Sequence, residues 1–284
     1  MNYPYKSHIY LAEVVLNVQN LERQTTFYHQ ILGLEILLQT EQEVILGRGE
    51  KALVHLRKVQ DKTPIRQLYG LYHMALLLPS RQDLADILKH LLEYQIPLVG
   101  GADHGYSEAI YLEDLEGNGI EIYWDKPVSE WDIREDGRII GVTEELDAQS
   151  IYELGRELEP FTIAAGTRMG HIHLSVNNGR AASQFYQAVL GLSEKFSLPS
   201  ASWLASGAYH HHLAVNEWGG PNLEQRQPDQ LGLAYFTAEV TDKEQLVAIH
   251  EQAQTKGGRS EWLSSSELLV TDQNGLAFLV RKVK

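Results

Sequence analysis

The sequence predicts an α+β protein built from four copies of a βαβββ module. An internal repeat indicates this architecture. The segments RQTTFYHQILGL and RAASQFYQAVLGL match at an offset of 158 residues, which places Phe27-Tyr28 over Phe185-Tyr186. The strand-like segments before them, LAEVVLNV and MGHIHLSV, also match. The chain therefore consists of two similar halves.

Each half also contains a second module of the same kind. It begins with a strand-like segment, GLYHMALLLP or LGLAYFTAEV, and continues with a helix over residues 80–94 or 241–256. It closes with EDLEGNGIEIYW or TDQNGLAFLVRK, in which Asn-Gly is a turn dipeptide. Alternating apolar residues are typical of strands, and helical spacing is typical of one apolar helix face. Residues with that helical spacing are Leu84, Ile87, Leu88 and Leu91.

The repeat also predicts the domain organisation. Residues 1–125 contain modules one and two, and residues 169–284 contain modules three and four. Residues 126–168 are expected to form a linker, with a hairpin around Asp136-Gly137 and a short helix from Asp147.

Composition limits the classes of partner. With 284 residues, 43% of them hydrophobic, the chain is long enough to form substantial cores. A net charge of -14 argues against binding to nucleic acid or to an anionic membrane. The chain has no cysteine, so a metal would need nitrogen and oxygen ligands. The absence of a signal-like start or a membrane-spanning stretch predicts a soluble, cytoplasmic protein.

Three strand-like segments contribute a possible metal-binding set, namely His73, Glu121 and His171. Two imidazoles and one carboxylate on one face of a metal are typical of non-haem Fe(II) oxygenases. Alternation places Glu121 and His171 away from the apolar packing face of their strands. A single such histidine is usually structural, but an inward carboxylate is costly unless it is paired or metal-bound.

The repeated module resembles the vicinal oxygen chelate superfamily, which includes glyoxalase I, bleomycin- and fosfomycin-resistance proteins and extradiol ring-cleaving dioxygenases. The FY…LGL helix carries this resemblance in both halves. The resemblance implies two half-open barrels, each made of two modules. It also implies metal ligands on the first and last strands of a module.

The superfamily's ligand positions imply which modules pair. They fall on His73 and Glu121 in module two and on His171 in module three. The corresponding residues of modules one and four, which cannot form such a site, are Glu13, Tyr235 and Ala277. We therefore expect modules two and three to pair, and modules one and four to pair. His173 points the same way as His171 and is the alternative ligand if the strand register shifts.

Further segments resemble bacterial catechol 2,3-dioxygenases. The stretch HHHLAV resembles their HHxLA motif, whose second histidine is the acid–base residue, here His211. Alternation would place His211 on the opposite strand face from His210 and His212. The segment DHGYSEAIYLEDLEGNGIE resembles their closing segment, which implies Tyr111 and His104 as active-site residues.

This resemblance implies an Fe(II) centre, with Mn(II) as an alternative, and O2 as co-substrate. The implied substrate is a small aromatic diol, either catechol or a substituted catechol, opened beside its hydroxyls to a 2-hydroxymuconate semialdehyde. His211 would act as base and then acid, while Tyr111 and His104 would hydrogen-bond the reacting oxygens. Candidate substrate-lining residues are His173, Tyr123, Trp203 and Trp218.

Three other functions remain open. A glyoxalase-type lyase or isomerase would use Ni(II) or Zn(II), but its second glutamate has no counterpart in module three. A hydroquinone-cleaving dioxygenase would use the same residues, and a non-catalytic resistance or binding protein would need no complete metal set. We expect a homo-oligomer, with the barrel of modules one and four as scaffold or interface.

Overall fold

The computed structural model describes residues 4–283 and contains four βαβββ modules. Module one comprises β1 (Tyr10–Val18), α1 (Leu21–Thr26), β2 (Glu35–Gln39), β3 (Glu43–Arg48) and β4 (Lys51–Lys58). Module two comprises β5 (Gly70–Leu78), α2 (Arg81–Glu93), β6 (Gly100–Asp103), β7 (Ser107–Glu113) and β8 (Gly119–Asp125). Module three comprises β12 (Arg168–Ser175), α4 (Gly179–Leu190), β13 (Ser193–Leu198), β14 (Ala201–Ala205) and β15 (Leu213–Asn216). Module four comprises β16 (Gly232–Val240), α5 (Lys243–Thr255), β17 (Arg259–Ser264), β18 (Glu267–Thr271) and β19 (Ala277–Lys282).

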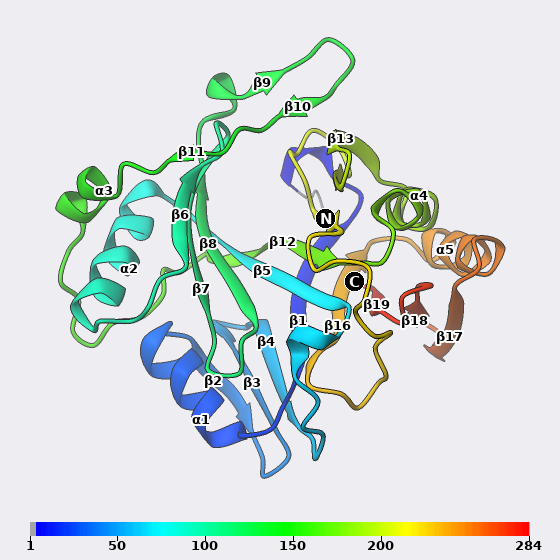
Figure 1. The fold of residues 1–284 in the computed structure, drawn as a ribbon, viewed down its shortest axis with the longest axis horizontal. Helices are drawn as coiled ribbons and strands as arrows, with labels where there is room; N and C mark the ends of the chain where they lie inside the picture. The colour runs from blue at the N-terminus through cyan, green and yellow to red at the C-terminus, as the bar shows by residue number, and fades with distance from the viewer. Residues whose placement is uncertain (1–3, 284) are drawn as a thin grey trace.

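The modules pair out of sequence order, as predicted. Modules two and three form one sheet in the order β11-β6-β7-β8-β5-β12-β15-β14-β13 (Figure 1). Modules one and four form the other, in the order β17-β18-β19-β16-β1-β4-β3-β2. In each sheet the first strands of the two modules pair antiparallel, β5 with β12 and β1 with β16. The predicted pairing of modules is therefore confirmed.

Alternation along the strands separates a packing face from a concave face. In β12, Ile172 and Leu174 belong to the main hydrophobic core, as does Val176 directly after the strand. The four predicted apolar positions of α2 are all buried in that core, where each fully buried aliphatic side chain contributes about 1.5–3 kcal/mol. The helices therefore cover the convex faces of the sheets and leave the concave faces for other groups.

The FY tyrosines link consecutive modules, which belong to different sheets. The Tyr28 hydroxyl donates to Asp114 Oδ2 at 2.9 Å, and the Tyr186 hydroxyl donates to Asp272 Oδ2 at 3.0 Å. Each aspartate's Oδ1 also accepts backbone N–H groups of its own closing turn. Module one is thus tied to module two, and module three to module four, by the same hydrogen-bonded pair.

The segment between the halves contains a hairpin, a short strand and a short helix. Strands β9 (Asp132–Ile133) and β10 (Ile139–Ile140) pair around Asp136-Gly137 and project at the top of Figure 1. Strand β11 (Glu144–Glu145) pairs with β6 and extends the nine-stranded sheet. Helix α3 (Ala148–Leu154) has Asp147 as its N-cap.

Within residues 4–283, no helix combines the length and apolar character needed to cross a membrane.

Candidate metal centre

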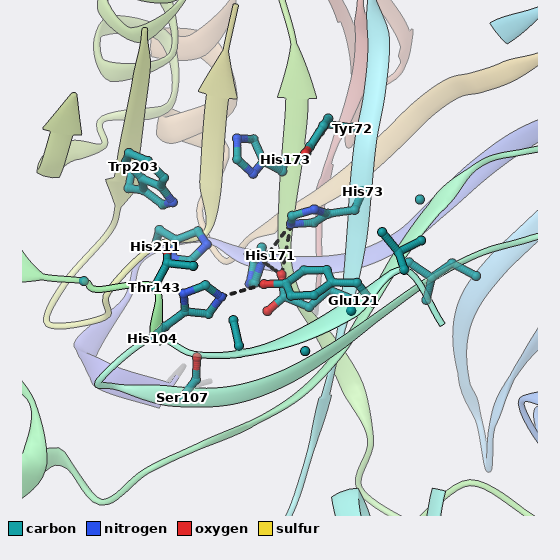
Figure 2. A pocket seen from close by; sticks show the side chains of 18 of the residues that line it. Tyr72, His73, His104, Ser107, Glu121, Thr143, His171, His173, Trp203 and His211 are labelled. Atoms are coloured by element: carbon teal, nitrogen blue, oxygen red, sulfur yellow. Dashed lines mark hydrogen bonds and ion pairs between the residues drawn. The ribbon is translucent and has the colours of Figure 1, made fainter. Parts of the chain in front are cut away.

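Three adjacent strands position His73, Glu121 and His171. The order β8-β5-β12 places Glu121, His73 and His171 on neighbouring strands of the concave face. Ala75 pairs in register with both Glu121 and His171, and its methyl group leaves room between the two longer side chains. A register shift in β12 between Met169 and His171 adjusts the alignment at this point. The three side chains point toward one another (Figure 2).

The donor atoms have the spacing that a metal requires. Glu121 Oε2 lies 3.0 Å from His73 Nε2 and 3.0 Å from His171 Nε2, and the two nitrogens are 3.3 Å apart. Three adjacent corners of an octahedron with bonds of about 2.1 Å are about 3.0 Å apart. The residues present therefore fit a divalent cation held on one face.

The protonation states of this set favour a cation. All three side chains are buried, and Glu121 has no lysine or arginine partner among the described residues. Burial opposes its ionisation, but the charge and hydrogen bonds of His171 and His73 outweigh it and hold the pKa of Glu121 well below its usual range. Burial lowers the pKa of His171 to about 4, so this imidazole is neutral near pH 7. An ionised carboxylate and a neutral imidazole are the forms that bind a metal.

The barrel of modules two and three contains the only such group within residues 4–283. No other set of three or more His, Asp or Glu donor atoms in that range lies within 4.8 Å of one another. His173 is not part of it, because its Nε2 lies 3.0 Å from the amide nitrogen of Asn216. Asn216 Oδ1 accepts the backbone N–H of Trp218, which orients the amide as a donor toward His173.

A cavity of about 670 Å³ opens beside the three donors. His173, Trp203 and Trp218 line it, together with His104, Tyr111 and His211. His211 and Trp203 lie across the cavity from His73 (Figure 2). The ring of Tyr72 packs edge-on against His173 and Trp218 at the cavity rim. The structure thus brings nine of the ten predicted site residues together.

Tyr123 is the exception, because it does not line the cavity. Its side chain is fully buried, and its hydroxyl lies 2.7 Å from that of Tyr209. The ring packs behind His171, at 4.9 Å between ring centroids, where Gly170 leaves the space for it. Alternation correctly assigned Tyr123 to the concave side, but the packing of Tyr209 and Gly170 separates it from the cavity.

Tyr111 and His104 form a hydrogen-bonded pair at the cavity wall. Tyr111 pairs in register with Glu121 across β7 and β8, and its hydroxyl lies 2.6 Å from His104 Nε2. The other nitrogen of His104, Nδ1, lies 2.8 Å from the Val142 carbonyl, which can only accept a hydrogen bond. In the neutral ring the proton is therefore on Nδ1, and Tyr111 donates to Nε2. Burial, followed by the charge of Glu121, raises the pKa of Tyr111 well above its usual range.

The histidine tract does not form the predicted strand. Residues 206–212 precede β15 as turns and irregular backbone, so the expectation of alternating faces is wrong. His210, His211 and His212 are all buried by tertiary contacts. Only His211 lines the cavity, and its ring packs against that of His171 with centroids 4.0 Å apart.

Part of the cavity wall comes from residues that the sequence did not single out. The linker contributes Gly141, Val142 and Thr143, and β13 contributes Phe196 and Leu198. The linker residues carry no chemical motif, and they reach the cavity only because β11 adds to the sheet edge. Tyr72, adjacent to His73, was detectable only as an aromatic residue beside a predicted ligand.

Comparisons with known proteins agree with this architecture. Residues 10–122 match the model of the Glyoxalase/Bleomycin resistance protein/Dioxygenase superfamily. A catechol-2,3-dioxygenase of Bacillus subtilis (strain 168) is 34% identical over 256 residues, covering 88% of this chain and 89% of the relative. The metallothiol transferase FosB of Staphylococcus haemolyticus (strain JCSC1435) is 26% identical over 116 residues, covering 40% of this chain and 81% of that relative.

Solved structures show the same fold at low sequence identity. A putative dioxygenase of Bacillus subtilis is similar with a TM-score of 0.62 at 10% identity, over 96% of this chain and 84% of that chain. A glyoxalase I variant of Zea mays has a TM-score of 0.60 at 13% identity, over 96% of this chain and 92% of that chain.

Proposed function

Because the chain belongs to the glyoxalase/bleomycin resistance protein/dioxygenase superfamily, we propose that it is an extradiol dioxygenase that opens a catechol beside its hydroxyls. The observation that carries this proposal is the convergence of His73, Glu121 and His171 beside an open cavity. The name of the 34%-identical Bacillus subtilis relative supports the same reaction. The expected product is a 2-hydroxymuconate semialdehyde.

His73, Glu121 and His171 would hold Fe(II) or Mn(II), since both ions accept two imidazoles and one carboxylate. The bound ion would supply a Lewis acid for the diol and a redox partner for O2. The three donors come from one side, which leaves the cavity side for the substrate.

His211 would take a proton from a substrate hydroxyl and later return it. Burial lowers the pKa of His211 well below its usual range, so the ring is neutral at pH 7 and has a nitrogen lone pair that can accept a proton. Its ring lies directly against that of His171, which places it beside the proposed reacting centre.

Tyr111 and His104 would hydrogen-bond the reacting oxygens. With His104 neutral, the Tyr111 oxygen is free to accept a hydrogen bond from a substrate hydroxyl. With a proton on His104 Nε2, the Tyr111 hydroxyl would instead donate to an oxygen that gains negative charge. The pair can therefore serve both directions of proton movement without moving the side chains.

The cavity wall favours an uncharged aromatic diol. Among the described residues, no lysine or arginine lines the cavity, whereas Tyr72, Phe196, Trp203 and Trp218 do. Aromatic rings stack well on such a wall, but a carboxylate on the substrate would lose its hydration without gaining a partner. Catechol or an alkyl- or halogen-substituted catechol fits this lining better than a carboxylated one.

Oxygen consumption tests the proposal. Metal-free protein is loaded with Fe(II) under anaerobic conditions, mixed with catechol and then exposed to air. We expect O2 uptake and a yellow ring-fission product, with little turnover of 3,4-dihydroxybenzoate. Loss of methylglyoxal–glutathione hemithioacetal, without O2 uptake on catechol, would instead indicate a glyoxalase-type enzyme.

A further inference from the structure

A line of buried hydrogen-bonding groups extends from the cavity into the protein behind His211. His211 Nδ1 lies 2.7 Å from His210 Nδ1, and His210 Nε2 lies 2.8 Å from Asp125 Oδ1. We propose that Asp125 and His210 are positioning residues that keep the proton of His211 on Nδ1 and leave its Nε2 lone pair toward the cavity. The catalytic consequence rests on the proposed function, but the placement of the proton does not.

The direction of the hydrogen bonds follows from which atoms can donate. The Asp125 carboxylate only accepts, so His210 Nε2 carries a hydrogen and donates to it. In neutral His210 the other nitrogen, Nδ1, then has a lone pair. Since His210 Nδ1 faces His211 Nδ1, the hydrogen between them belongs to His211. The remaining nitrogen of His211, Nε2, has no hydrogen-bond partner in residues 4–283 and is left for a ligand in the cavity.

Aromatic packing holds the central ring of this line in place. The His210 ring is 1% exposed and stacks on Tyr106, at 4.2 Å between centroids and 11° between planes. Trp131 packs edge-on against it at 5.2 Å. The Tyr5 hydroxyl donates to the second oxygen of Asp125 at 3.3 Å. Neither His210 nor Asp125 can rotate away without breaking these contacts.

The arrangement determines what His211 offers to a substrate. A neutral imidazole with its hydrogen on Nε2 would present a donor to a diol hydroxyl and could not accept its proton. With the hydrogen on Nδ1, Nε2 is a base, and the hydrogen bonds to His210 and Asp125 would stabilise the positive charge that His211 gains when it accepts a proton. An aspartate that fixes a histidine tautomer in this way is known to affect turnover by orders of magnitude in hydrolases. Asp125 and His210 would thus act through His211 without touching the substrate.

Asp125→Asn is the direct test, because an asparagine side-chain nitrogen can donate to His210 Nε2. His210 would then carry its hydrogen on Nδ1 and donate to His211, which would move the His211 hydrogen to Nε2. The tautomers can be read by ¹⁵N NMR of histidine-labelled, metal-free protein, with the His211 signals assigned from the His211→Asn variant. We expect an Nδ1–H tautomer for His211 in the unsubstituted protein and an Nε2–H tautomer in Asp125→Asn. An Nε2–H tautomer in the unsubstituted protein, or no change in the variant, would overturn the proposal.

Kinetics with the Fe(II)-loaded protein provide the second measurement. We expect Asp125→Asn to keep its metal content and its anaerobic catechol affinity within about 2-fold, and to lose about 100-fold or more in kcat. Asp86→Asn is the matched control, since Asp86 is a buried carboxylate of α2 that pairs with Arg156 and does not line the cavity. An equal loss of kcat in both variants would indicate a general structural effect and would contradict the positioning role.

Two further variants keep the test decisive. Asp125→Glu retains the carboxylate and should restore part of the lost kcat. If Asp125→Asn does not fold, His210→Phe preserves the stacking on Tyr106 but removes both ring nitrogens. It should lose kcat while retaining metal, and unchanged kcat would refute the proposal. If the unsubstituted protein does not cleave catechols, the proposed function fails, whereas the NMR result still decides the tautomer of His211.

Discussion

At the scale of single residues, Glu121 has the most demanding environment in the cavity. It is a buried carboxylate whose ion-pair partners among the described residues are two imidazoles, of which His171 is neutral at pH 7. A buried charge of this kind is costly unless a cation compensates it. A bound cation would therefore stabilise the ionised form of Glu121. The electrostatics of the three residues thus favour a metal, as their geometry does.

Replacing Glu121 by glutamine should therefore abolish most metal binding. Glutamine has nearly the same shape but lacks the negative charge, so we expect Fe(II) affinity to fall by about 100-fold or more. Metal analysis after anaerobic loading and gel filtration measures the effect. Glu108→Gln is the control, because Glu108 is also buried but is paired with Arg81. Equal metal content in all three proteins would refute the metal role of Glu121.

His211→Asn should separate metal binding from turnover. Asparagine removes the ring base, so we expect kcat to fall by about 10²- to 10⁴-fold while the metal content stays near that of the unsubstituted protein. Steady-state O2 uptake with catechol and metal analysis of the same sample provide the measurements. Turnover at the original rate would remove His211 from the mechanism.

The strand face on which a residue lies could be predicted from the sequence, but contacts that residues make through loops could not. Strand alternation predicted that Glu121 and His171 lie on the concave side, because side-chain direction in a strand depends only on position, and the family's ligand spacing placed His73 with them. The same rule gave Tyr123 the correct side but not its separation from the cavity. The contact between Asp125 and His210 joins positions 85 residues apart through a loop without periodicity, so no local pattern could predict it.

At the scale of elements, one hydrogen-bonded pair explains why the FY helix recurs. Tyr28 and Tyr186 each bond the aspartate that organises the closing turn of the following module. Sheet pairing joins module two to three and module one to four, whereas these tyrosines join one to two and three to four. The repeat at 158 residues therefore preserves both a helix and its contact with the next module.

Removing one of these tyrosine hydroxyls should destabilise the protein without affecting the metal centre. Tyr28→Phe leaves the packing of a fully buried ring in place but deprives Asp114 of a donor. We expect the free energy of unfolding to fall by about 1–3 kcal/mol, as measured by urea denaturation of metal-free protein. Tyr94→Phe, at an exposed position, is the control. Equal stability of both variants would show that the link contributes nothing.

The elements were largely predictable, since their signals are local. Strand alternation, the helix face of α2 and the Asn-Gly turns each depend on a few neighbouring residues. The histidine tract was not predictable, because HHHLAV continues the alternation of β15, but His210 and His211 lie in irregular backbone and His210 pairs with Asp125. Tertiary contacts there outweigh the strand pattern.

At the scale of the whole molecule, the non-sequential pairing concentrates buried histidines in one barrel. Burial lowers the pKa values of His171, His173, His211 and His212, that of His171 to about 4. The module order could be predicted because sequential pairing would have separated His171 from the other two ligands. The depth of burial could not, because it depends on loops and linker residues that cover the barrel.

These histidines should make metal-free protein sensitive to acid. An unfolded histidine has a pKa of about 6.5, so between that pH and about 4 the unfolded chain binds protons that the folded chain excludes. Their contribution to stability is complete above about pH 6.5 and is lost as the pH falls toward 4, with up to about 3 kcal/mol from His171. Urea unfolding at about pH 7.5 and about pH 5 measures this loss. An unchanged free energy of unfolding would show that these rings are not buried in the neutral form.

Isotope labelling of the product tests the central claim most directly. Fe(II)-loaded protein is supplied with catechol and ¹⁸O2, and the ring-fission product is analysed at once by mass spectrometry. A dioxygenase centred on His73, Glu121 and His171 should place both labelled atoms in a ring-opened product, and His73→Ala should form none. A product with a single label, or one formed equally well by His73→Ala, would contradict the account.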